Sequence, residues 1–124
     1  MKKYLSIMLP MCAWLLAACL FLSPYAYADP PQDVVLSYNI QAQTLTVTIT
    51  HPSSFTGLHY IKQVKIMKNN EWTEKNDYKS QASKTTFVYT YGVPATANDL
   101  LEVTATCNLL GKKTATLKVE QQKN

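Results

Sequence analysis

Three side chains of this sequence combine the types and the placement that a metal site requires: His51, His59 and Cys107. The two histidines flank one loop, where one expected strand ends and the next begins. Cys107 ends a later expected strand, just before a turn. Two imidazoles and a thiolate are donors suited to iron, copper or zinc. The spacing therefore predicts a metal site formed by these three residues.

A structural interpretation of the same residues stays open. Two histidines that flank a loop occur by chance, and a single buried cysteine in a strand is ordinarily inert packing. Cys12 and Cys19 lie in the N-terminal leader, so the domain keeps Cys107 as its one cysteine and forms no internal disulfide.

Other chemistries find little support. The chain has three glycines and no glycine-rich phosphate loop, no nucleophile motif around a serine, and no carboxylate pair that the strand pattern places on one inward face. We therefore predict no catalytic residues and no organic cofactor. Outside the leader, ten lysines face eight acids and arginine is absent, so we also expect no nucleic-acid partner.

The elements that must position the three residues are strands. From Asp33 onward, apolar and polar residues alternate, and the pattern changes phase between Ile61 and Val64, which predicts a β-bulge. We expect Trp72 and Tyr78 to anchor a polar edge segment. The pattern predicts an all-β fold, an immunoglobulin-like antiparallel β-sandwich of about seven strands, in which the ends of alternate strands gather at one rim. The expected strands are 36–40, 44–50, 60–67, 71–79, 86–91, 101–107 and 115–119.

The first 28 residues have the layout of a secretory signal peptide. Lys2 and Lys3 precede an apolar stretch, and Ala26 and Ala28 form an A-x-A cleavage motif. We predict a signal peptide over 1–28 and one domain over 29–124, in a periplasmic or secreted protein. Two alternatives stay open: lipidation at Cys19, which ends a lipobox-like Leu-Ala-Ala-Cys, and an uncleaved anchor. Only a lipidated or uncleaved leader links the domain to a membrane.

Two motifs resemble a known family. The segment 51–61, HPSSFTGLHYI, is similar to the H-P-x(n)-H-[YH]-I stretch of the desulfoferrodoxin and superoxide reductase family. The segment 107–111, CNLLG, resembles that family's C-N-x-H-G motif. The resemblance covers roughly 44–119 and implies an immunoglobulin-like sandwich. It also implies one iron ion held by four equatorial histidines and an axial cysteine, with reduction of superoxide to peroxide.

Carried over residue by residue, the resemblance makes His51 and His59 equatorial ligands and Cys107 the axial ligand. Leu110 stands where the family has another histidine, and the first loop supplies none, so three of five ligands remain. This argues against superoxide reductase activity. We expect a mononuclear transition-metal site, with iron as the metal that the resemblance implies and other transition metals open. The implied partner is a periplasmic protein or electron donor.

A second resemblance supports a non-enzymatic alternative. The threonine-histidine-proline segment at 50–52, the glycine at 57 and the segment 59–64 are similar to the sulfur-oxidation carrier subunit that partners a chain with a swinging cysteine. The tail at 121–124 lacks the glycine-rich cysteine arm. On this hypothesis the domain is a periplasmic interaction or structural sandwich with a vestigial site.

Overall fold

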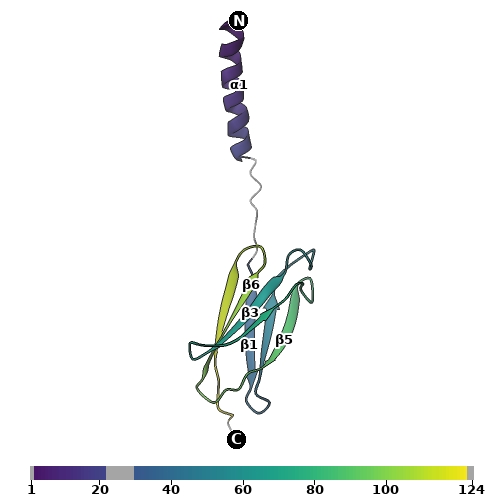
Figure 1. Cartoon of the computed structure of the whole chain (residues 1–124), viewed down its shortest axis with the longest axis vertical. Helices are drawn as coiled ribbons and strands as arrows, with labels where there is room; N and C mark the ends of the chain where they lie inside the picture. Colours follow the sequence, from purple (N-terminus) through teal and green to yellow (C-terminus); the bar gives the residue numbers. More distant parts are fainter. Residues whose placement is uncertain (1, 22–29, 123–124) are drawn as a thin grey trace.

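The computed structural model describes residues 2–21 and 30–122, and the domain within it is a sandwich of two antiparallel β-sheets (Figure 1). This confirms the predicted fold class. The chain forms one helix followed by seven strands: α1 Lys2–Phe21, β1 Asp33–Asn39, β2 Thr44–Thr50, β3 Ile61–Lys68, β4 Glu71–Asp77, β5 Thr86–Gly92, β6 Leu100–Cys107 and β7 Lys112–Lys118.

The two sheets differ in size. One has three strands in the order β1-β2-β5, and the other has four in the order β4-β3-β6-β7. The central strands, β3 and β6, pair so that Ile61 lies opposite Cys107. The start of β3 and the end of β6 therefore meet at one rim of the sandwich, which is the placement that the predicted site requires.

The core follows from the alternation of the sequence. In β2, Leu45, Val47 and Ile49 point inward and are fully buried, while threonines occupy the outward positions, where β-branched side chains suit a solvated sheet face. The same alternation in β6 buries Cys107 at its end. The predicted bulge is confirmed, since the β3–β6 register shifts between Ile61 and Gln63.

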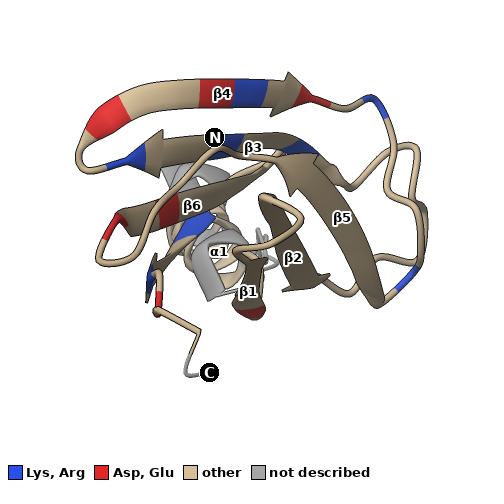
Figure 2. Cartoon of the chain, turned by 90° about the horizontal axis from the view of Figure 1, so that it is seen from below, with Lys and Arg blue, Asp and Glu red and all other residues tan. Residues whose placement is uncertain are grey.

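The edge strand β4 corrects one expectation. Trp72 does not anchor it: 60% of this side chain is exposed, and its ring lies 5.6 Å from the Lys65 ammonium. Figure 2 shows β4 along the outer edge of the larger sheet. The facing sheet has one strand fewer, and no β4 residue is fully buried. Tyr78 does anchor the segment that follows, because its hydroxyl lies 2.6 Å from that of Tyr91.

The leader is described only in part. Residues 2–21 form α1, and the predicted cleavage position after Ala28 lies outside the described residues, as does the side chain of Cys19. In the described part of the chain, no helix has the length and apolarity needed to cross a membrane.

Candidate metal centre

His51 follows directly after β2 and is fully buried. Its backbone N–H donates to the carbonyl oxygen of Thr85 at 2.8 Å, which holds the chain as it leaves the sheet. Its ring nitrogen Nδ1 lies 2.7 Å from Oε1 of Gln81. The imidazole is therefore fixed both through its backbone and through its ring.

Gln81 determines the proton position on that ring. Its amide nitrogen donates to the carbonyl oxygens of His51 at 2.6 Å and Ser83 at 2.8 Å. Its oxygen must then face the ring, and an amide oxygen only accepts, so Nδ1 of His51 carries the proton. In the neutral imidazole the lone pair then belongs to Nε2, the nitrogen that can coordinate a metal. A hydrogen bond of this kind from the second ring nitrogen is typical of metal-ligating histidines.

His59 ends the loop that begins at His51. Its N–H donates to the carbonyl of Phe55 at 2.9 Å, and its own carbonyl accepts the hydroxyl of Ser53 at 2.5 Å. Within the described residues its Nε2 is buried and has no hydrogen-bond partner. Leaving such an atom unsatisfied costs about 1–3 kcal/mol. A buried ring nitrogen without a hydrogen-bond partner is expected of a histidine that coordinates a metal ion.

Cys107 is the last residue of β6 and is only 2% exposed. The following residue, Asn108, ties this strand end to the histidine loop. Its backbone N–H donates to the carbonyl of Tyr60, and its Oδ1 accepts from the N–H of Tyr60, each at 2.9 Å. Its Nδ2 donates to the carbonyl of Leu58, also at 2.9 Å. Asn108 therefore fixes the distance between the thiol and the His59 loop.

The structure brings all three predicted residues together. One ligand atom from each of His51, His59 and Cys107 lies within 4.8 Å of the others, and the two imidazole rings meet edge to face with centroids 4.5 Å apart. Donors that share one ion at bonds of about 2.0–2.3 Å lie at most about 4.5 Å apart. The three donors are therefore close to the spacing that one shared ion requires.

Sequence reasoning missed the two residues that orient the donors. Gln81 lies in the irregular segment between β4 and β5, where no periodic pattern marks it. Asn108 belongs to the motif that carries the resemblance, but its three bonds to the histidine loop follow only from the fold. Leu110, at the position of a family histidine, is 68% exposed and contributes no donor.

The surface around the group is apolar and basic. Four exposed apolar side chains stand on the two loops that carry the donors: Phe55, Leu58, Leu109 and Leu110. Lys112 and Lys113, the first residues of β7, follow directly after the second loop and are exposed. The turn itself packs against the start of the domain, because Gly111 adopts a positive φ of 93° with its backbone close to Pro30.

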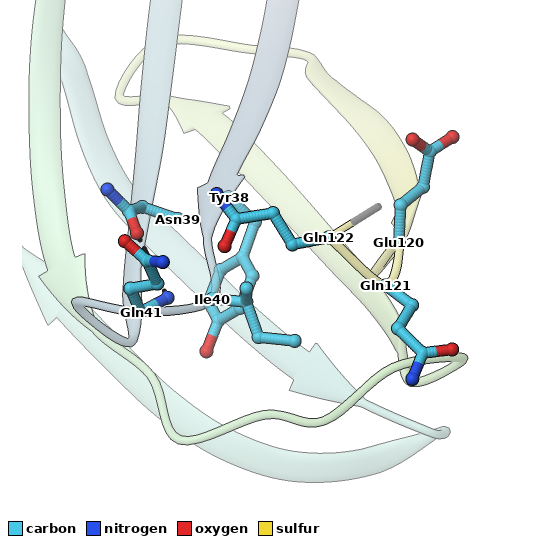
Figure 3. A pocket seen from close by; sticks show the side chains of 7 residues that line it. All are labelled: Tyr38, Asn39, Ile40, Gln41, Glu120, Gln121 and Gln122. Carbon is cyan, nitrogen blue, oxygen red and sulfur yellow. Dashed lines mark hydrogen bonds between the residues drawn. The ribbon is translucent and has the colours of Figure 1, made fainter. Parts of the chain in front are cut away.

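An open groove of about 600 Å³ lies at the opposite end of the sandwich (Figure 3). Its floor includes Tyr38, whose hydroxyl donates to the carbonyl of Val93 at 2.7 Å. The lining is mostly amide and carboxylate, without histidine or cysteine: Tyr38, Asn39, Ile40, Gln41, Glu120, Gln121 and Gln122. This groove has no donor set for a soft or borderline metal.

Comparisons with known proteins give a likeness in fold. No family model and no curated protein matches the chain. Among solved structures, it is similar to the superoxide reductase (neelaredoxin) from Ignicoccus hospitalis, with 14% identity and a TM-score of 0.46 over 74% of this chain and 81% of that chain. A form of that protein with one threonine replaced by lysine gives 13% identity and a TM-score of 0.45 over 78% and 87%.

Proposed function

We propose that this domain binds one transition-metal ion through Nε2 of His51, Nε2 of His59 and Sγ of Cys107. The observation that carries the proposal is the buried Nε2 of His59, which has no hydrogen-bond partner among the described residues. The His59 side chain also lies in one group with His51 and Cys107. A structural histidine in a core normally has its nitrogens satisfied. A bound ion supplies the missing partner and offsets the cost of burying that nitrogen.

The residues do not fit the iron centre that the resemblance implies. That centre needs four imidazoles and a thiolate, and the whole chain contains two histidines. Two histidines cannot form the plane of four imidazole nitrogens that such an iron centre places opposite its thiolate. We therefore propose a metal-binding domain and do not propose superoxide reductase activity.

Metal content tests the proposal directly. The chain is purified without chelators, and its metals are measured by mass spectrometry beside the variants Cys107→Ser and Thr104→Ser. Thr104 lies on the outward face of β6, the strand that ends at Cys107, and serves as the matched control. We expect about one transition-metal ion per chain, retained in Thr104→Ser and lost in Cys107→Ser. Protein that is free of metal and takes up no added iron, copper or zinc would refute the proposal.

We further propose that the protein is exported and acts in the periplasm or outside the cell. The support is the layout of residues 1–28, with two lysines, an apolar stretch and an A-x-A motif. The intact mass of the mature protein from a bacterial host tests this. Loss of 28 residues supports cleavage after Ala28, a lipid-modified chain beginning at Cys19 supports tethering, and a full-length cytoplasmic product contradicts export.

A second candidate function is a non-enzymatic interaction domain with a vestigial site. The observation that favours it is the set of four exposed apolar side chains on the two site loops, Phe55, Leu58, Leu109 and Leu110. The metal measurement separates the two candidates. If the chain binds no metal and Cys107→Ser leaves its fold unchanged, the interaction function is the better supported of the two.

A further inference from the structure

The number of donors limits the metals that the site can hold. Both histidines of the chain already belong to the group. In the part of the chain that the structure describes, no carboxylate joins them. The side chain set is therefore two nitrogens and one sulfur, which is smaller than the sets of non-haem iron sites or of closed structural zinc sites.

The surroundings do not supply further donors. His51 is 0% exposed, Cys107 is 2% exposed, and Nε2 of the half-buried His59 is itself buried, so solvent has little approach to complete a larger shell. The neighbouring polar side chains are already engaged: Ser53 with the His59 carbonyl, Gln81 with two carbonyls and the His51 ring, and Asn108 with the backbone of the histidine loop. The arrangement favours an ion that is stable with three ligands.

Charge separates the remaining metals. A thiolate and two neutral imidazoles carry a total charge of −1. A monovalent ion makes the buried unit neutral, whereas a divalent ion leaves it at +1. The side chains that hydrogen-bond to the donor side chains are the neutral amides of Gln81 and Asn108, and no described carboxylate compensates an excess positive charge. Burying an uncompensated charge is costly, so the site disfavours zinc(II) and iron(II) relative to a monovalent ion.

We infer that the group is a three-coordinate copper(I) site, an inference that rests on the metal binding proposed above. Copper(I) is monovalent and soft, thiolates select it, and imidazoles bind copper well. Gln81 and Asn108 take part in the selection because they orient the donors without adding negative charge. The identity of the ion thus follows from donor number, burial and charge together.

The test uses the full chain with Cys12→Ser and Cys19→Ser, so that Cys107 is its only thiol. Copper(I) is titrated anaerobically against a chromogenic copper(I) chelator, and zinc(II) and iron(II) are offered in parallel. We expect one copper(I) per chain, held at least about 100-fold more tightly than zinc(II), because the divalent ion leaves a buried charge. X-ray absorption is expected to show one sulfur and two nitrogens around copper. Adding Cys107→Ser should abolish binding.

A charge variant tests the selection itself. Asn108→Asp adds a carboxylate next to Cys107 with little change of size. We expect the preference for copper(I) over zinc(II) to fall by about tenfold, because a nearby negative charge compensates the divalent ion. Thr104→Asp, on the outward face of the same strand, serves as the control and should leave the preference unchanged.

The outcomes distinguish the two proposals. If zinc(II) or iron(II) displaces equimolar copper(I), or if copper is found with four or more protein or solvent ligands, the copper(I) inference is wrong and the metal site stands. If none of the three ions binds to a folded chain, both fail. If Asn108→Asp fails to fold, the copper(I) inference is still tested by X-ray absorption and by zinc competition on the chain with the unaltered site.

Discussion

Two glutamines hold the two ends of this sandwich, and they differ in what they hold. At the end away from the site, Gln43 donates to the carbonyls of Ile40 at 2.7 Å and Ala95 at 2.9 Å and accepts from the N–H of Ala95 at 2.8 Å. All of its partners are backbone atoms. At the site end, Gln81 makes the same kind of double donation, but its oxygen faces the ring of His51.

The same double donation by a glutamine amide holds only backbone at one end, whereas at the other end it also orients a histidine ring. Gln43 closes the β1–β2 turn. The groove between this turn and the C-terminal segment is open and lined mostly by polar side chains (Figure 3). Gln81 fixes a buried imidazole that faces His59, whose Nε2 has no partner among the described residues. A polar network in which every group has a hydrogen-bond partner stabilises a fold. A network next to a buried ring nitrogen that lacks a partner indicates a binding site.

The largest expected effect is that of His51→Ala. This change removes a fully buried ring together with its bond to Gln81, so we expect the free energy of unfolding to fall by about 2–4 kcal/mol and metal binding to be lost. Urea unfolding with and without metal measures both. If the variant binds metal as tightly as the unaltered chain, His51 is not a ligand.

The pair Gln81→Ala and Gln43→Ala tests the comparison itself. Both variants lose backbone hydrogen bonds, so each should be destabilised by about 1–3 kcal/mol. Only Gln81→Ala should weaken metal binding, by about 10- to 100-fold, because only Gln81 orients a ligand. Isothermal titration of both variants with the same ion measures this, and equal affinities in the two variants would contradict the distinction between the ends.

Gly111→Ala probes the turn that carries the site rim. The residue has a φ of +93°, and an added Cβ would lie 2.7 Å from Cβ of Pro30. We expect a loss of about 1–3 kcal/mol in the free energy of unfolding from backbone strain and this clash. Gly57→Ala is the matched control, since nothing lies within 4 Å of its added Cβ. Thermal unfolding of the two variants should differ clearly.

His59→Leu is expected to separate stability from binding. The substitution removes a buried nitrogen that lacks a partner, so the metal-free variant should be as stable as the unaltered chain or more stable by up to about 1–2 kcal/mol. Metal binding should be lost. Chemical unfolding in the presence of a chelator measures the first effect. A marked loss of stability would mean that the ring is a packing element and that the site account is wrong.

The smallest expected effect lies at the opposite end. Hydrogen bonds from the Thr96 N–H and the Asn69 amide hold the pKa of Asp99 below its ordinary value of 3.8. A lowered carboxyl pKa adds stability above the unfolded pKa, and this is lost as the pH falls through the folded value. The melting temperature of the unaltered chain should therefore fall slightly more below about pH 4 than that of Asp99→Asn, with metal binding unchanged. A metal affinity that follows Asp99 would contradict the separation of the ends.

Much of this arrangement could be predicted from the sequence, because it depends on local pattern. The alternation in 44–50 and 101–107 gives the inward faces, and the phase change after Ile61 gives the bulge. The meeting of His51, His59 and Cys107 follows from strand ends that share a rim. The role of Gln81 could not be predicted, since it depends on how an irregular segment folds back against the loop that follows β2. The exposure of Trp72 depends on the smaller size of the facing sheet, which the β4 sequence does not encode.

The chain's two histidines allow a direct measurement of the central claim. With ¹⁵N-labelled imidazoles, nuclear magnetic resonance gives one set of ring signals for His51 and one for His59, and each Nε2 can be followed as copper(I) is added. We predict that both Nε2 signals shift together, that the change is complete at one equivalent, and that the Nδ1 proton of His51 is retained by its bond to Gln81. Signals that stay in place, or that move for only one histidine, would contradict a metal centre shared by His51, His59 and Cys107.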